Sequence, residues 1–194
     1  MKIWKLMEEK GIATFPKPVY HRVPNFIGAE KAAQNLRNLP EYKKAKVIFC
    51  NPDSPQRPVR EMTLEDGKIL VMATPRLKHG FLVIAPETTV GKERFASTIK
   101  GAFNFGKETT DFPKPDLIVT GSVAVDKDGN RLGKGRGYGD REIRMIKEKF
   151  GKVPVVTSIH DIQLINYATS TPQDEKLDII VTPTKIIRIK RNKR

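Results

Sequence analysis

A stretch of alternating glycines and basic residues, residues 126–140, carries the residue types best suited to binding a charged ligand. Glycine occupies positions 133, 135, 137 and 139, and Lys134 and Arg136 lie between the first three. Glycine adopts positive φ angles at little cost and lets the backbone approach a ligand closely. Residues 117–125 before the stretch favour a strand and residues 140–150 after it favour a helix, so loop amides and a helix N-terminus can converge on an anion. The sequence therefore predicts a phosphate-binding loop.

Two better-known phosphate motifs are absent from this stretch. It does not end in Gly-Lys-Ser or Gly-Lys-Thr, and it lacks the Gly-x-Gly-x-x-Gly spacing of dinucleotide-binding loops. A flexible glycine-rich surface loop is the alternative interpretation. Asp140, at the expected start of the helix, can either cap that helix or hold a Mg²⁺ that bridges phosphates.

The charge of the chain favours acidic partners. Its 194 residues include 36 Lys and Arg against 22 Asp and Glu, a formal net charge of +14. Nucleotides, polyanionic small molecules and nucleic acid are the partner classes that such a balance favours. The segment 185–194 holds six basic residues and no acidic one. It is either a solvated edge strand with a frayed end or an arm that contacts RNA.

Several classes of protein and site are disfavoured. No apolar run reaches the roughly 18 to 20 residues of a membrane span, and the N-terminal residues do not resemble a secretory signal, so we expect a cytoplasmic protein. Cys50 is the single cysteine and closes the apolar run 45–50, which predicts a buried small hydrophobe rather than a nucleophile. His21, His79 and His160 show no paired spacing for a zinc site.

The hydrophobic pattern predicts helices and apolar strands in alternation. Helices are expected at 1–10, 28–39 and 140–150, and a proline-containing extended segment at 14–26. Strands are expected at 45–50, 69–73, 81–85, 117–125, 153–159, 177–182 and 185–189. Residues 91–105 show a mixed pattern. Such alternation implies one α/β domain, residues 1–194, with a sheet covered on both faces and a basic tail at 185–194.

Candidates for binding a substrate lie after two of the predicted strands. Asn51 and Asp53 follow the strand at 45–50, and Arg60 and Arg76 are cations suited to pairing with carboxylates. Each has a plainer interpretation, because Asn-Pro-Asp is also a common turn and the arginines can form structural ion pairs. The His160-Asp161 pair can be an acid–base pair or hydrogen-bonded scaffolding.

Several motifs together resemble the 5-formyltetrahydrofolate cyclo-ligase family, also called methenyltetrahydrofolate synthetases. The most specific is the run Arg131-Leu-Gly-x-Gly-x-Gly-Tyr-x-Asp140, followed later by Gln163, Pro172 and the strand at 178–182. The branch called methenyltetrahydrofolate synthase domain-containing proteins is resembled more closely, through Trp4, Phe15-Pro16, residues 21–26, Asn51-Pro52-Asp53, residues 74–77 and Gly133-Lys134-Gly135. The resemblance spans nearly the whole chain and implies a three-layer α/β/α sandwich with a mostly parallel central sheet.

What the resemblance implies is an ATP- and Mg²⁺-dependent conversion of 5-formyltetrahydrofolate to 5,10-methenyltetrahydrofolate. The γ-phosphoryl group moves to the formyl oxygen, N10 attacks the activated carbon and phosphate leaves. Phosphoryl transfer depends on positioning and charge neutralisation. By the resemblance, Arg131 neutralises phosphate charge and Asp140 holds Mg²⁺, while amide contacts and a pocket wall come from Gly133, Gly135, Gly137 and Tyr138. Lys134 and Arg136 are further nucleotide-binding candidates on charge and position, and Lys134 joins Arg131 as a catalytic candidate.

Two other functions stay open at the level of sequence. One is a cyclo-ligase-like protein that acts on another substrate, and the other is a nucleic-acid-binding protein on the same fold, motivated by the +14 charge and the tail at 185–194. The favoured partners are ATP and a reduced folate, and the chain is expected to be a monomer or a homodimer.

Overall fold

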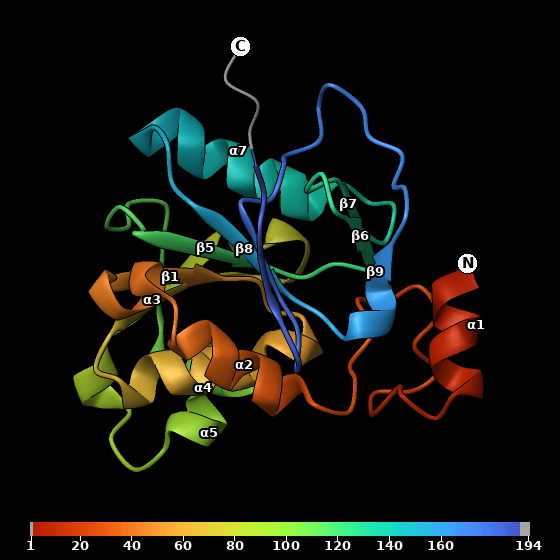
Figure 1. The fold of residues 1–194 in the computed structure, drawn as a ribbon. Helices are drawn as coiled ribbons and strands as arrows, with labels where there is room; N and C mark the ends of the chain where they lie inside the picture. The colour runs from red at the N-terminus through yellow and green to blue at the C-terminus, as the bar shows by residue number, and fades with distance from the viewer. Residues whose placement is uncertain (1, 191–194) are drawn as a thin grey trace.

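The computed structural model of the protein describes residues 2–190. A sheet runs through its centre (Figure 1). It has eight strands in the order β11-β10-β8-β5-β1-β2-β3-β4. The strands are β1 Val47–Cys50, β2 Ile69–Ala73, β3 Phe81–Ile84, β4 Lys107–Thr109, β5 Leu117–Thr120, β8 Val155–Ser158, β10 Ile179–Val181 and β11 Ile186–Arg188. The five central strands from β10 to β2 are parallel, and β11, β3 and β4 run antiparallel to their neighbours. The prediction of a mostly parallel sheet is confirmed.

Helices cover both faces of this sheet. The α-helices are α1 Lys2–Glu9, α2 Ala29–Arg37, α3 Pro40–Lys44, α4 Arg57–Glu65, α5 Glu93–Ala96, α6 Ile99–Phe105 and α7 Tyr138–Phe150. Short 3₁₀ turns complete the set: η1 Ser54–Gln56, η2 Pro75–Leu77, η3 Pro86–Thr88 and η4 Asp161–Gln163. α7 lies on one side of the sheet and α2, α4 and α5 lie on the other (Figure 1). The three-layer α/β/α arrangement expected from the sequence is therefore confirmed.

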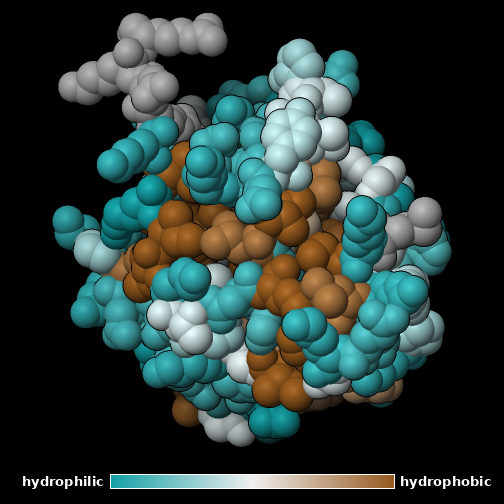
Figure 2. Space-filling model, turned by 45° about the vertical axis from the view of Figure 1, so that its right-hand side comes forward, coloured by the Kyte–Doolittle hydropathy of each residue, from teal (hydrophilic) through white to brown (hydrophobic). Residues whose placement is uncertain are grey.

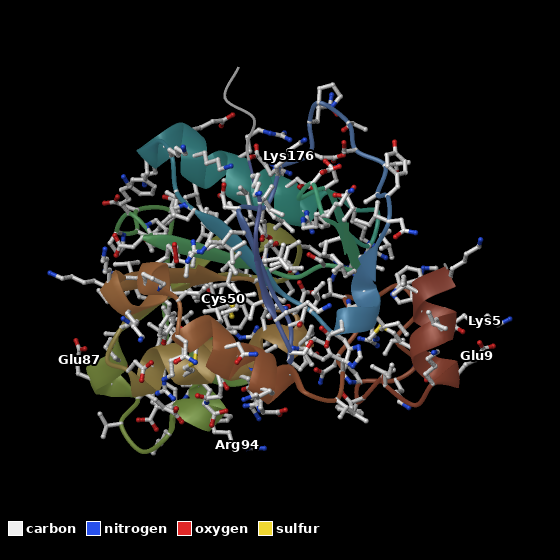
Figure 3. The ribbon with its side chains drawn as sticks, in the orientation of Figure 1. Lys5, Glu9, Cys50, Glu87, Arg94 and Lys176 are labelled. Carbon is white, nitrogen blue, oxygen red and sulfur yellow. The ribbon has the colours of Figure 1, made fainter. Side chains whose placement is uncertain are left out.

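The central strands are buried on both faces, so the sheet has a hydrophobic core on each side. Alternate residues of β1 point to opposite sides, so that Ile48 and Cys50 pack with the helices α2 and α4, whereas Phe49 packs with α7. Cys50 has no exposed surface and lies in the interior of the molecule (Figure 3). Burial raises the pKa of its thiol to about 12. Cys50 is thus a small core residue, as predicted.

The predicted strand at 117–125 is wrong in its continuity. β5 ends at Thr120, and the chain then enters a separate three-stranded sheet of β6 Ala124–Asp126, β7 Arg131–Leu132 and β9 Leu164–Ile165. Gly121 lies at the break. A Cβ atom there would come within 2.8 Å of the Gln56 side-chain oxygen and 2.9 Å of a carboxylate oxygen of Asp53. Only glycine fits at position 121, because the loop between β1 and η1 packs against the chain at the point where β5 ends.

The N-terminal segment at 14–26, predicted to be extended, instead contains bends and turns and is held against α1. The Trp4 indole nitrogen donates to the Arg22 carbonyl at 2.9 Å, and Ala13 pairs with Phe26 in an isolated bridge. Trp4 and Phe26 belong to a third hydrophobic cluster between this segment and α2. This packing brings residues 20–23 over the carboxyl ends of β1 and β5.

Helix α4 was not predicted, and it changes the interpretation of Arg60. The Arg60 side chain is buried, and its guanidinium donates to three backbone carbonyls, those of Asn51 at 2.6 Å, Asp53 at 2.9 Å and Ser97 at 2.9 Å. The guanidinium therefore fixes the conformation of the chain that follows β1. The prediction that Arg60 contacts a substrate carboxylate is thus wrong, because a buried guanidinium bonded to the backbone is not presented to a ligand.

The surface is mostly hydrophilic (Figure 2), and part of the basic tail belongs to the central sheet. Within residues 2–190, no helix is long and apolar enough to cross a membrane. Exposed charged residues such as the Lys5–Glu9 pair of α1 stand on the outside of the molecule (Figure 3), and a band of hydrophobic residues crosses one face among hydrophilic ones (Figure 2). Residues 186–188 of the basic tail form the edge strand β11. The rest of the tail at 191–194 lies outside the described residues.

Replacing the buried guanidinium should loosen the loop that carries Asn51 and Asp53. In Arg60→Met three carbonyls lose their donor, so we expect a loss of about 3 kcal/mol in the free energy of unfolding, measured by urea denaturation. Arg57→Met is the matched control on the same helix, because Arg57 forms a part-exposed pair with Glu61 worth no more than about 1 kcal/mol. Equal losses in the two variants would contradict this role for Arg60.

Candidate functional site

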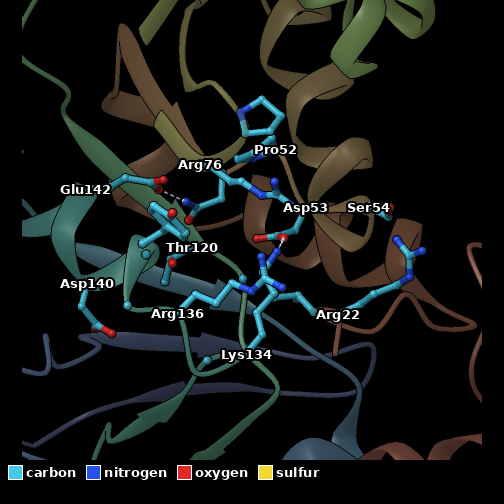
Figure 4. Close-up of a pocket in the computed structure, with 18 of the residues that line it drawn as sticks. Arg22, Pro52, Asp53, Ser54, Arg76, Thr120, Lys134, Arg136, Asp140 and Glu142 are labelled. Atoms are coloured by element: carbon cyan, nitrogen blue, oxygen red, sulfur yellow. Dashed lines mark hydrogen bonds and ion pairs between the residues drawn. The ribbon is translucent and has the colours of Figure 1, made fainter. Parts of the chain in front are cut away.

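A pocket of about 410 Å³ opens at the carboxyl ends of β1, β2 and β5. Ligands of open α/β sheets bind at this edge, where loops diverge from neighbouring strands. Six segments supply its walls: residues 20–23, the loop after β1, the turn after β2, the start of α6, the end of β5, and the glycine loop with the start of α7. Figure 4 shows side chains from these segments converging on one space.

The pocket collects most of the residues singled out from the sequence. Those that line it are Asn51, Asp53, Arg76, Arg131, Gly133, Lys134, Arg136, Gly137, Tyr138 and Asp140. Gly135 lies on the loop but does not line the pocket, and Arg60 lies behind it. The glycine loop and the Asn-Pro-Asp turn thus share one site although they are about 80 residues apart in the chain.

Arg131 and Asp140 form the frame of the glycine loop. Arg131 Nη2 lies 2.8 Å from Asp140 Oδ2, and Arg131 Nη1 donates to the Gly121 carbonyl at 2.9 Å. Asp140 Oδ1 accepts from the Glu175 backbone amide at 3.1 Å. Gly139 makes room for this arrangement, since a Cβ atom there would lie 3.0 Å from Arg131 Nη2. Both groups are therefore engaged with the protein in this structure.

Four cationic side chains besides Arg131 line the pocket. Lys134 Nζ lies 3.1 Å from Asp53 Oδ1, which links the glycine loop to the loop after β1. Arg22, Arg76 and Arg136 are exposed at the rim, and their guanidinium groups have no partner among residues 2–190 (Figure 4). This rim offers positive charge to an anionic ligand.

The loop and the helix after it fit a phosphate group. Gly137 adopts φ 69° at the N-cap of α7, and no side chain caps the first amides of that helix. Uncapped amides at a helix N-terminus, beside Lys134 and Arg136, provide the donors and the charge that phosphate requires. The residues fit Mg²⁺ less well. Both oxygens of Asp140 already accept contacts from the protein, one from Arg131 and one from the Glu175 amide.

A buried acid, Glu142, was missed in the sequence. It is 3% exposed, lines the pocket from α7 and accepts a hydrogen bond from the Asn51 side-chain nitrogen. Its position beside Ile143 and four residues before Ile146, on the apolar stripe of the helix, was the available signal. Thr120, Ile99 and residues 20–22 also line the pocket and carried no comparable signal.

The environment of Glu142 favours its protonated form. Burial raises the pKa of Glu142 to about 8, and the negative charge of Asp53 adds to the rise. The hydrogen bond from Asn51 and the charges of Arg131 and Lys134 act in the opposite direction but do not cancel it. A carboxyl group of this kind can exchange a proton near neutral pH.

The His160-Asp161 pair is scaffolding. His160 Nδ1 accepts from the Ile162 amide at 3.1 Å, and the Gln163 side chain closes the same turn. Asp161 accepts from the hydroxyl groups of Thr182 and Thr184, at 2.6 and 2.5 Å. Of the two interpretations left open from the sequence, the structural one is correct.

Glu142→Gln should remove a pH-dependent penalty on folding. The unfolded chain releases the Glu142 proton above about pH 4.5, whereas the folded chain keeps it to about pH 8, so the native state loses stability as pH rises through this window. Relative to Glu142→Gln, the native chain should lose on the order of 2 kcal/mol of unfolding free energy between pH 5 and pH 8. Urea denaturation at both values measures this difference. Parallel pH profiles for the two proteins would refute it.

Comparison with known proteins identifies relatives over nearly the whole chain. The methenyltetrahydrofolate synthase domain-containing proteins of Bos taurus and Mus musculus are 41% and 42% identical to it, across 96% of this chain and 52% and 53% of their own. The chain thus spans about half the length of these curated relatives. Among solved structures, the 5,10-methenyltetrahydrofolate synthetase of Aquifex aeolicus has the same fold, with a TM-score of 0.62, 21% identity and coverage of 100% of this chain and 94% of that one.

The family assignment rests on the sequence itself. Residues 2–183 match the family model for 5-formyltetrahydrofolate cyclo-ligases, and this range includes every pocket residue described above. The arrangement of the glycine loop against the loop after β1 is therefore a feature of the matched region. The chain belongs to the 5-formyltetrahydrofolate cyclo-ligase family.

Proposed function

We propose that the protein catalyses the ATP-dependent conversion of 5-formyltetrahydrofolate to 5,10-methenyltetrahydrofolate. The observation that carries this proposal is that one pocket contains both a cationic glycine loop and a separate polar wall of Asn51, Asp53 and Glu142. A phosphoryl donor and a second, smaller polar substrate can therefore meet in the same space. The family match and the methenyltetrahydrofolate synthetase fold support the same reaction.

In this reaction the protein chiefly positions the substrates and neutralises the charge of the phosphates. Bound ATP supplies the phosphoryl group that converts the formyl oxygen of the substrate into a leaving group. N10 of the folate then bonds to the formyl carbon and phosphate departs. Lys134 and Arg136 offset the charge of the phosphates, and the first amides of α7 orient them. Arg131 and Asp140 hold the loop in shape, and Tyr138 lines the pocket beside it.

The remaining pocket residues belong to the folate side of this proposal. Asn51 and Asp53 line the pocket from the loop after β1, and Arg76 offers a cation for a folate carboxylate at the rim. We assign no step to Mg²⁺, because Asp140 has both oxygens engaged. A cytoplasmic location and a monomeric or dimeric state stay predictions from the sequence.

Lys134→Gln should impair turnover without unfolding the protein. The Lys134 side chain is 38% exposed, so its loss removes charge at the phosphates rather than core packing. We expect kcat/KM for 5-formyltetrahydrofolate to fall roughly 10- to 100-fold, followed by the absorbance of methenyltetrahydrofolate. Lys127→Gln, at an exposed turn outside the pocket, should be as active as the native chain.

Two outcomes in these variants would count against the glycine loop as the phosphate site. Unchanged kinetics and unchanged ATP affinity in Lys134→Gln would place the nucleotide elsewhere. A fall in activity of the Lys127→Gln control would show that lysine removal acts through net charge rather than through the pocket.

A further inference from the structure

The pocket is divided by charge in a way that the proposed reaction does not by itself require. Its exposed rim carries the cations Arg22, Arg76, Lys134 and Arg136 (Figure 4). Its buried wall carries an amide and a carboxyl group, those of Asn51 and Glu142. A ligand that matches both ends has anionic groups on one side and hydrogen-bond donors on the other. The hydrogen-bonding groups of the buried wall determine which donors such a ligand must carry.

Hydrogen bonds hold Asn51 in a single orientation, and only its side-chain oxygen lacks a partner among residues 2–190. Its backbone nitrogen donates to the Val119 carbonyl at 3.1 Å, and its carbonyl accepts from Arg60 at 2.6 Å. Its side-chain nitrogen donates to Glu142, so the amide cannot turn over without losing that bond. The side-chain oxygen is buried and has no hydrogen-bond partner among residues 2–190. A buried acceptor without a donor is unfavourable, and a ligand N–H satisfies it.

Glu142 provides a second acceptor beside the first. One of its oxygens receives the Asn51 hydrogen bond, and the other receives no hydrogen bond from residues 2–190. Neither of the nearest cations fills the gap. Arg131 is bonded to Gly121 and Asp140, and Lys134 to Asp53. When Glu142 is ionised, the wall therefore has two acceptors without a donor from residues 2–190, the Asn51 side-chain oxygen and the second Glu142 oxygen, and a ligand that donates to them favours that ionised form.

Two adjacent acceptors discriminate between the ring systems that the proposed reaction brings together. The 2-amino-4-oxopyrimidine edge of a reduced pterin offers an amino group and a ring N–H side by side, which is a donor–donor pair. The adenine edge offers an amino group beside an unprotonated ring nitrogen, which is a donor–acceptor pair. A site with two acceptors leaves that ring nitrogen facing a carboxylate or carbonyl oxygen, and mismatched buried polar groups are strongly rejected.

We propose that Asn51 and Glu142 form the subsite that recognises the paired N–H donors of the folate head group, with the carboxylate end of the substrate directed toward Arg22 and Arg76. That the ligand is a folate rests on the proposed function. That its bound edge carries two N–H donors rests on the acceptors of Asn51 and Glu142 alone. It makes Glu142, on α7, a determinant of substrate specificity rather than a member of the phosphate loop.

The test compares two small fluorescent probes that differ at one position of the ring. Pterin carries the 2-amino group, and lumazine carries a carbonyl there instead. The native chain should bind pterin at least about tenfold more tightly than lumazine. In Glu142→Gln the introduced amide offers an N–H where the carboxylate offered an acceptor, so the preference should vanish or reverse. Glu148→Gln, on the exposed face of the same helix, should keep the native preference.

A second pair of variants keeps the test decisive if Glu142→Gln folds poorly. Arg22→Gln and Arg76→Gln alter exposed side chains, so they should weaken binding of 5-formyltetrahydrofolate at least about threefold and leave pterin binding unchanged. Circular dichroism of each variant checks its fold. A native chain that binds lumazine as well as pterin, or a Glu142→Gln variant that folds and keeps the preference, would overturn the assignment.

Failure of this subsite and failure of the proposed function have different signatures. Formation of methenyltetrahydrofolate by a native chain that shows no pterin preference overturns the subsite alone. A pterin preference that depends on Glu142, without any cyclisation in the presence of ATP, supports the subsite and overturns the reaction. ATP serves as a further probe, since its affinity should be the same in Glu142→Gln as in the native chain.

Discussion

The buried contact of Arg131 with Asp140 and the Gly121 carbonyl is the interaction on which the pocket depends. It ties three pieces of chain together: the end of β5, the strand β7 and the first turn of α7. Because the guanidinium is only 4% exposed and the carboxylate 15%, the pair is shielded from solvent and fixes the loop between them. The glycines of that loop can then offer amides and Arg136 can offer charge, whereas Lys134 also links the loop to Asp53.

A second buried arginine performs the matching task on the opposite wall. Arg60 donates hydrogen bonds to the carbonyls of Asn51 and Asp53, so these buried backbone groups are satisfied although the chain after β1 is neither helix nor strand there. The ion pair of Lys134 with Asp53 then joins the two walls across the pocket. The pocket is built from two loops, each bonded to a buried arginine, with an ion pair between them, which suits a reaction that must hold two substrates in line.

The sequence predicted the layers of the fold and the glycine loop, because buried parallel strands read as continuous apolar runs and glycine alternating with cations is an uncommon pattern. It did not predict helix α4, since Pro58 and two arginines in residues 57–60 obscure the apolar face that Val59 and Met62 form. It also merged β5 with β6, because the break at Gly121 depends on the packing of Gln56 and Asp53, which are distant in sequence. Arg60 and Glu142 were misjudged for the same reason: burial of a charged side chain is decided by its tertiary partners.

The coupling of nucleotide consumption to cyclisation tests the central claim most directly. Purified chain, ATP and 5-formyltetrahydrofolate are mixed, and ADP and methenyltetrahydrofolate are measured in the same sample. A phosphorylated formyl oxygen as the activated group predicts one ADP for each methenyltetrahydrofolate formed, and neither product when either substrate is omitted. Methenyltetrahydrofolate formed without ATP, or ADP released at an equal rate without the folate, would contradict the account.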